Sequence, residues 1–204
     1  MNKINLAIFA STKGTDLQAI IDAIKSNELP EADLKFVLSN KKDCYAMQRA
    51  EAAGIKTVFI NAKGLSREEF DQQCLEACLE QKIDLIIFIG YMRLISGVLL
   101  DPYRNRIMNI HPSLLPKYPG MDLDVHNEVL ANHETETGCT LHFVDEGMDT
   151  GPIILQHHLP IEPAETAEAL KNKVQAEEQK VILEGIKLFS QDRLKVTGRQ
   201  VAIV

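Results

Sequence analysis

Three polar residues of this chain have the side chains that an acyl-transfer reaction needs. Asn109 and His111 lie in the run Asn-Ile-His-Pro-Ser-Leu-Leu-Pro, and Asp149 lies in Gly-Met-Asp-Thr-Gly-Pro. An amide donates N–H bonds to the oxyanion that forms when a carbonyl is attacked, and an imidazole exchanges a proton near neutral pH. A carboxylate at about 4–6 Å would orient that imidazole and raise its pKa. These three residue types predict a catalytic centre that binds a carbonyl.

The spacing of Asn109 and His111 supports a shared site. The two residues are separated by one position, so at the end of an extended strand both side chains project from the same face. Pro112 and Pro116 then stiffen the loop that follows. The sequence contains no Ser or Cys in a nucleophile-elbow motif, which favours transfer to a nucleophile of the substrate over an acyl-enzyme.

Each of these signals also has a purely structural interpretation. An Asn-x-His pair at the end of a buried strand can be a satisfied polar pair that covers a sheet edge. Asp149, followed by Thr, Gly and Pro, can be a turn former. The chemical interpretation therefore depends on whether the fold brings the three side chains together.

Composition is typical of one compact globular domain, with 204 residues, 45% hydrophobic and 25% charged. The net charge of −7 and the lack of a Lys/Arg-rich block argue against a nucleic-acid or membrane surface. The N-terminus enters a strand-like segment without the features of an export signal, so we expect a cytoplasmic protein. Composition leaves open whether it is a monomer or a homodimer.

The four cysteines are too few and too scattered for a disulfide framework, and we expect reduced thiols. Cys74 and Cys78 are four positions apart on a predicted helix. Their neighbours Phe70 and Ala77 favour a buried stripe over a metal site, and we predict no metal.

Hydrophobic periodicity predicts strands that alternate with helices. Strands are expected at 4–10, 34–39, 55–60, 84–90, 106–110, 140–144 and 153–159, and helices at 15–27, 43–53, 66–81, 125–131 and 166–189. Ser66 and Glu69 fit a capping box at the start of the helix at 66–81. A short strand-turn-strand follows at 194–204. Such alternation predicts an α/β fold with a Rossmann-like, doubly wound, mostly parallel sheet that has helices on both faces, and ligands bind at the carboxyl ends of the strands.

The loop Ser11-Thr12-Lys13-Gly14-Thr15-Asp16 follows the first predicted strand. Free N–H groups at the start of the next helix favour an anion there, and Lys13 adds a full charge. The loop lacks the G-x-G-x-x-G pattern of dinucleotide sites, so a monophosphate is the expected ligand. Thr15 and Gln18 alternatively fit a capping box, which would explain Thr15 without a ligand.

Several motifs resemble phosphoribosylglycinamide formyltransferases and occur in the same order as in that family. The resemblance extends over roughly residues 4 to 190, and the Asn-Ile-His-Pro-Ser-Leu-Leu-Pro run is specific to the folate-dependent formyltransferase and deformylase superfamily. The matching segments are 14–20, 90–95, 109–116, 117–120, 138–144 and 148–152.

The resemblance implies an enzyme that moves the formyl group of 10-formyltetrahydrofolate to the amino group of glycinamide ribonucleotide in purine (IMP) biosynthesis. Asn109, His111 and Asp149 match the catalytic residues of the family. The folate site matches Arg67, Met92, Arg93, Leu94, Ile95 and Asn109, and the ribonucleotide site matches Ser11, Lys13, Gly14, Thr15, Asp16 and Glu178.

The resemblance also implies how the single domain, residues 1–204, is organised. Residues 1–100 would form a phosphate-binding, Rossmann-like half, 101–190 a catalytic and folate-binding half, and 191–204 a C-terminal tail. Both partners are then small molecules, and no metal is implied.

The sequence departs from the family mainly in two loops. Most relatives read Ser-Gly-x-Gly-Ser-Asn where this chain has Ser-Thr-Lys-Gly-Thr-Asp, which puts the Asp16 carboxylate where it would repel phosphate. Either Lys13 offsets this charge or Asp16 turns away as a local cap. The segment 121–125 is longer and more acidic than in many relatives. His142 alternates with Leu141 and Phe143, so it is expected on the other face of its strand as a structural contact.

Three other functions use some of the same features. A formyltetrahydrofolate hydrolase would use the same three residues with water, although we expect an extra N-terminal regulatory domain in such an enzyme. A different amine, such as an amino sugar, would also fit the motif. A non-catalytic folate- or nucleotide-binding module would not need all three residues.

Overall fold

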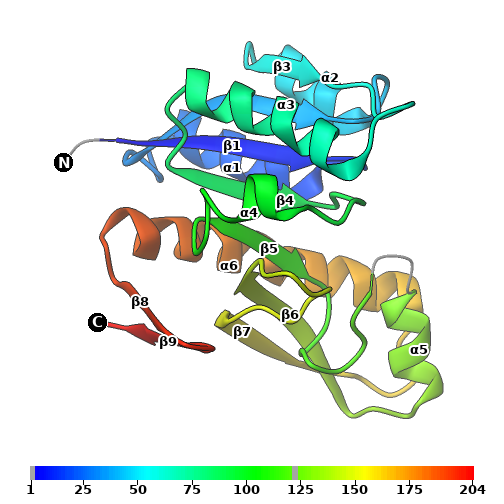
Figure 1. Cartoon of the computed structure of the whole chain (residues 1–204). Helices are drawn as coiled ribbons and strands as arrows, with labels where there is room; N and C mark the ends of the chain where they lie inside the picture. The colour runs from blue at the N-terminus through cyan, green and yellow to red at the C-terminus, as the bar shows by residue number, and fades with distance from the viewer. Residues whose placement is uncertain (1–2, 121–123) are drawn as a thin grey trace.

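The protein is described by a computed structural model that covers residues 3–120 and 124–204 (Figure 1). The acidic segment 121–125, where the sequence departs from the family, therefore falls largely outside the described residues.

A seven-stranded sheet forms the centre of the molecule, with the strand order β3-β2-β1-β4-β5-β6-β7. The first five strands pair in parallel, and β6 and β7 are antiparallel additions at one edge. The prediction of a Rossmann-like, mostly parallel sheet is confirmed. The strands are β1 (Ile4–Ala10), β2 (Ala32–Ser39), β3 (Lys56–Phe59), β4 (Leu85–Ile89), β5 (Ile107–His111), β6 (Glu136–Phe143) and β7 (Ile153–Pro160).

Helices cover both faces of the sheet and create two hydrophobic cores (Figure 1). Helices α1 (Thr15–Lys25), α2 (Tyr45–Ala52) and α6 (Ala167–Ser190) contribute to one core. Helices α3 (Arg67–Glu80) and α4 (Gly97–Leu100) contribute to the other. Every residue of β4 is buried, as expected for a strand covered on both sides. The sequence pattern missed α4, which is too short to show a helical period.

The starts of α1 and α3 test the two predicted capping boxes. At α3 the prediction is confirmed: Ser66 accepts the backbone N–H of Glu69, and the Glu69 side chain accepts that of Ser66. At α1 it is wrong, because Gly14 is the N-cap and no side chain caps the helix. Gly14 has φ 65°, and a Cβ there would lie 2.7 Å from the Cβ of Ala46, so α1 begins in a close approach to α2 that requires glycine.

Two smaller elements complete the chain. Helix α5 (Val125–Ala131) has the predicted bounds, and β8 (Leu194–Thr197) pairs with β9 (Gln200–Ile203) as the predicted strand-turn-strand. The division at residues 100 and 190 stays a prediction. In the part of the chain that the structure describes, no helix is both long and apolar enough to cross a membrane.

The cysteines are free thiols. Cys74 and Cys78 are buried in the core beside Phe70, which confirms the predicted apolar stripe. Burial raises the pKa of the Cys78 thiol to about 12. Within residues 3–120 and 124–204 we find no group of three or more His, Cys, Asp or Glu side chains placed to hold a metal ion.

Candidate active site

Strand β5 presents Asn109 and His111 to one pocket, as their spacing predicts. Strand β4 pairs with β5 as far as Asn109, and β6 pairs with β5 at both Asn109 and His111. In the antiparallel register Asn109 lies opposite His142 and His111 lies opposite Thr140. The side chains therefore come from the interior of the sheet, where their positions are well fixed.

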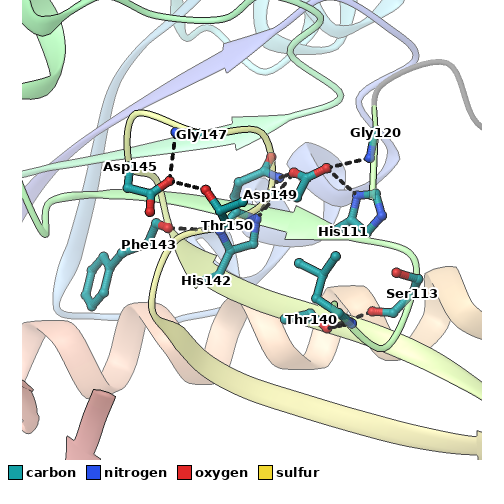
Figure 2. A network of polar contacts seen from close by, with 12 residues as sticks. His111, Ser113, Gly120, Thr140, His142, Phe143, Asp145, Gly147, Asp149 and Thr150 are labelled. Atoms are coloured by element: carbon teal, nitrogen blue, oxygen red, sulfur yellow. Dashed lines mark hydrogen bonds and ion pairs between the residues drawn. The ribbon is translucent and has the colours of Figure 1, made fainter. Parts of the chain in front are cut away.

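The third residue, Asp149, enters from the loop between β6 and β7 and contacts both residues of β5. Figure 2 shows its carboxylate beside His111. Its Oδ1 accepts a hydrogen bond from Nδ2 of Asn109 at 3.3 Å, and its Oδ2 lies 3.5 Å from Nδ1 of His111. The backbone N–H of Gly120 also donates to Oδ2, at 2.8 Å. The fold thus brings the three predicted side chains together around one carboxylate.

Asp145 holds the loop that carries Asp149. Its Oδ1 accepts the backbone N–H of Gly147 at 3.0 Å and the hydroxyl of Thr150 at 2.6 Å (Figure 2). Asp149 itself has φ 53°, a left-handed conformation that is uncommon for a non-glycine residue. These bonds fix a strained turn whose effect is to aim the carboxylate at β5.

His142 is a member of the site that the sequence analysis missed. The predicted alternation is correct, but the face that carries His142 is the face of Asn109, and the imidazole is 2% exposed. Its Nδ1 lies 2.9 Å from the carbonyl oxygen of Phe143, so this nitrogen must carry the proton. Its Nε2 lies 3.1 Å from Nδ2 of Asn109 and 3.6 Å from Oδ1 of Asp149. The missed signal is the pairing of two strands that are far apart in sequence.

The expected rise in the pKa of His111 does not occur in this structure. Burial lowers this pKa, and the opposing effects of Asp149 and of the Tyr118 carbonyl are smaller. Nε2 of His111 lies 2.7 Å from that carbonyl oxygen, which can only accept, so Nε2 carries the proton of the neutral ring. Asp149 is near enough to favour the imidazolium, but desolvation dominates.

Asp149 is held as a carboxylate. Burial raises its pKa, but the hydrogen bond to His142, the Gly120 N–H and the charges of both histidines together bring the pKa below its ordinary value. A negative charge therefore lies between two imidazoles and an amide, where it can receive a proton or stabilise a cation.

The hydroxyl of Thr140 on β6 holds the loop that follows β5 through two hydrogen bonds. The Thr140 hydroxyl donates to the carbonyl of Ser113 at 2.7 Å and accepts the N–H of Leu115 at 3.1 Å (Figure 2). The Ser113 hydroxyl donates to the Lys117 carbonyl at 2.6 Å. These bonds, with the two prolines, position the Tyr118 carbonyl against His111.

A pocket of about 240 Å³ opens beside the catalytic residues. Its lining includes Asn109, His111, Asp149 and His142, together with Met92, Arg93, Leu94 and Ile95 of the segment after β4. The loop from Val144 to Met148 also lines it. Five of the six predicted folate residues, all except Arg67, therefore line the pocket of the catalytic residues.

The two arginines predicted for the folate site are in different places. The guanidinium of Arg93 stacks 4.2 Å from the centre of the Phe70 ring, and its buried Nε has no hydrogen-bond partner among the described residues. Arg67 is exposed at the start of α3 and does not line this pocket. Asp71 on α3 holds the end of the segment that contains Arg93, because it accepts both the N–H and the hydroxyl of Ser96.

The predicted phosphate loop is partly occupied by internal contacts. Ser11 is buried, donates its hydroxyl to Oδ1 of Asn40 at 2.8 Å and accepts the N–H of Met92 at 3.3 Å, so it links this loop to the folate segment. Lys13 is exposed and Thr15 is half-buried at the first position of α1.

Asp16 neither faces solvent nor caps α1, which corrects the idea that it turns away as a local cap. Its side chain is buried, and its pKa is raised by that burial. Glu178 on α6 is also buried, and its pKa is raised first by burial and then by the charge of Asp16. These two predicted ribonucleotide residues are 162 positions apart in the chain, yet the charge of Asp16 affects the pKa of Glu178.

The comparisons with known proteins all point to one family. The Formyl transferase family matches residues 4–186. The phosphoribosylglycinamide formyltransferase of Escherichia coli (strain K12) is 37% identical over 95% of this chain and 90% of its own length. The trifunctional purine biosynthetic protein adenosine-3 of Drosophila melanogaster is 43% identical over 83% of this chain, which corresponds to 12% of that larger protein.

A solved structure agrees with the sequence comparison. The crystal structure of glycinamide ribonucleotide transformylase 1 from Symbiobacterium toebii superposes with a TM-score of 0.93 at 39% identity, covering 99% of this chain and 94% of that one. With the Asn-His-Asp cluster in place on the same fold, the chain belongs to the formyl transferase family and, within it, to the phosphoribosylglycinamide formyltransferases.

Proposed function

We propose that this chain transfers the formyl group of 10-formyltetrahydrofolate to the amino group of glycinamide ribonucleotide, giving formylglycinamide ribonucleotide and tetrahydrofolate in purine biosynthesis. The observation that carries the proposal is the contact of Asn109 and His111 with one half-buried carboxylate, Asp149, at the wall of a pocket. Membership of the family supports the same reaction.

Asn109 and His111 supply the hydrogen bonds that the reaction needs at the formyl oxygen. Attack of the amine on the formyl carbon places a negative charge on that oxygen, and N–H donors positioned beforehand stabilise it. In the described structure the Asn109 amide faces Asp149 and His142, and Nε2 of His111 faces the Tyr118 carbonyl. The formyl oxygen takes the place of these internal acceptors.

Asp149 handles the proton. After attack, the amine nitrogen carries a proton that it must lose, and the folate nitrogen needs one when its bond to the formyl carbon breaks. A carboxylate with a lowered pKa accepts the first proton directly or through water, and His111 at 3.5 Å is the neighbour that stabilises or relays it. No covalent intermediate with the chain is needed.

The pocket beside the catalytic residues fits a flat, partly apolar ring system. Leu94, Ile95 and Val144 in its lining provide apolar surface, and the loop residues Glu146 and Gly147 also line it. We assign the folate to this pocket through Met92, Arg93, Leu94 and Ile95, with Asn109 at the formyl group. Arg67, exposed and outside the pocket, is assigned to the outer part of the folate.

The ribonucleotide is assigned to the loop at the end of β1. Ser11, Lys13, Gly14, Thr15 and Asp16 surround the start of α1, and Glu178 lies on the neighbouring helix α6. Free N–H groups of the first turn suit a phosphate. We expect small-molecule partners, a monomer or a homodimer, and a cytoplasmic location.

The reaction is tested by following release of the deformylated folate with and without glycinamide ribonucleotide. Release that requires the ribonucleotide supports the transferase. Release without it would indicate the hydrolase, and release only with another amine, such as an amino sugar, would indicate a different acceptor.

A further inference from the structure

The loop after β1 and the segment after β4 are in direct contact. The two strands pair in parallel, with Ala10 opposite Ile89 at their ends. The backbone N–H of Ser11 donates to the carbonyl of Gly90 at 3.2 Å. Gly90 has φ 55°, and a Cβ there would lie 2.2 Å from Oγ1 of Thr12. This glycine therefore permits a close approach between two loops that are assigned to different substrates.

The hydroxyl of Ser11 has both of its hydrogen-bonding roles filled by the protein. Ser11 is 3% exposed. It donates its hydroxyl proton to Oδ1 of Asn40, directly after β2, at 2.8 Å, and its oxygen accepts the backbone N–H of Met92 at 3.3 Å. A phosphate dianion needs donors, and a serine hydroxyl has one proton to donate. Because that proton goes to Asn40, the side chain of Ser11 has no donor left for a phosphate.

Met92 begins the segment that lines the pocket assigned to folate. Residues 91–96 form neither helix nor strand, so other contacts must fix their backbone. Among the described residues we find no acceptor for the Met92 N–H besides the Ser11 hydroxyl. At the far end of the segment, Asp71 accepts the N–H and the hydroxyl of Ser96. Ser11 thus holds the start of the folate segment, and Asp71 holds its end.

We propose that Ser11 is a positioning residue for the folate site: its hydroxyl, oriented by Asn40, fixes Met92 and does not bind the phosphate of the ribonucleotide. The inference rests on the proposed function, because it assumes that folate occupies the pocket lined by residues 92–95. The backbone of Ser11 keeps its place in the ribonucleotide loop. Only the role of the side chain moves from one substrate to the other.

The two substrates should therefore respond differently to loss of the hydroxyl. Without it, the Met92 N–H lacks its acceptor, and the segment must shift to recover one or leave a polar group unpaired. Either result changes the wall of the folate pocket. Both partners of the hydroxyl lie outside α1, so the N–H groups at the start of that helix keep their positions.

The test is Ser11→Ala, measured by calorimetry with one substrate at a time. 10-Formyltetrahydrofolate, without ribonucleotide, should bind about tenfold more weakly than to wild type, as expected when a donor loses its acceptor. Glycinamide ribonucleotide, without folate, should bind within about twofold of wild type. Ser26→Ala removes an exposed hydroxyl at the end of α1 and should follow wild type with both substrates. If Ser11→Ala weakens the ribonucleotide alone, or both substrates equally, the proposal is overturned.

Variants of Asn40 test how the hydroxyl is oriented. Asn40→Asp keeps an acceptor for the Ser11 proton and should bind folate like wild type. Asn40→Ala removes the acceptor and should weaken folate binding about threefold. Adding Asn40→Ala to Ser11→Ala should then cost nothing further, because both substitutions act through the same contact. Fully additive losses would contradict the assigned chain from Asn40 through Ser11 to Met92.

Failure of the proposed function would give a different pattern. If wild type binds 10-formyltetrahydrofolate but not glycinamide ribonucleotide, the proposed acceptor is wrong, and the loss of folate affinity in Ser11→Ala still supports the positioning role. If wild type binds no folate, both the proposed function and the role of Ser11 are overturned.

Discussion

Nδ1 of His111 lies 3.5 Å from Oδ2 of Asp149, and yet the pKa of His111 is below its ordinary value. Burial explains the difference, because removing the imidazolium from water costs more than the neighbouring carboxylate returns. The pair is therefore a neutral imidazole beside a carboxylate in the ligand-free protein at neutral pH. A substrate that brings charge into the pocket changes the balance between burial and the attraction of Asp149 that sets the pKa of His111.

Asp149→Asn should lower turnover by about 10²–10⁴, the range typical for loss of a group that transfers protons. The substitution keeps the shape of the side chain but removes the charge that favours imidazolium at His111. NMR titration should show the pKa of His111 falling below its wild-type value. A variant with normal turnover would show that Asp149 only shapes the loop.

Asn109→Ala should lower kcat by about 10²–10³ if the amide is an oxyanion donor. The binding of both substrates should change little, because the lost hydrogen bond is strongest in the transition state. Asn172→Ala, an exposed residue on α6, is the control for loss of an amide and should leave kcat unchanged. Near-normal turnover of Asn109→Ala would refute the assigned role.

His142→Phe should reduce kcat about tenfold or more and leave the KM for folate nearly unchanged, as expected for a group that acts in the transition state. Phenylalanine keeps the bulk of the ring but removes Nε2, which positions the Asn109 amide at 3.1 Å. His142→Gln restores a polar group and should recover part of the activity. If both variants lose the same activity, or if only KM changes, His142 does not act through Asn109.

Gly185→Ala should destabilise the fold by about 1–3 kcal/mol through overpacking. A Cβ at Gly185 on α6 would lie 2.2 Å from Cδ2 of Leu141 on β6, where the helix crosses the sheet. Denaturant unfolding measures the change. Unfolding at the wild-type midpoint would show that α6 can move away from β6 at little cost.

Acidic pH should destabilise the protein through Asp149. Its folded pKa is lowered, so the stability that it contributes is present above the unfolded value and is lost as pH falls through the folded value. Unfolding free energy measured below about pH 4 should fall less steeply for Asp149→Asn than for wild type. An identical slope would mean that the contacts with Asn109, Gly120 and the histidines do not favour the charged form.

Local sequence signals predicted the elements well. Strand β1 and helix α5 have the predicted bounds, and the capping box at Ser66 is present, because each depends on residues a few positions apart. The capping box predicted at Thr15 failed because the close approach of Gly14 to Ala46 sets the start of the helix. This contact is not visible in the local pattern.

Non-local relationships account for what the sequence missed at the site. The role of His142 follows from its register opposite Asn109, and the pKa of His111 depends on how deeply the fold buries it. The effect of the Asp16 charge on the pKa of Glu178 likewise requires that α1 and α6 pack together. The residue types identified the chemistry. Only the packing shows which of the titratable side chains are charged in the folded protein.

The most direct test of the central claim uses a 10-formyl folate donor labelled in the formyl group, incubated with glycinamide ribonucleotide and the protein. We predict that the label appears in the ribonucleotide in equal amount to the folate released, and that Asn109→Ala and Asp149→Asn slow both together. Label released as free formate, at the same rate with or without the ribonucleotide, would contradict a transferase.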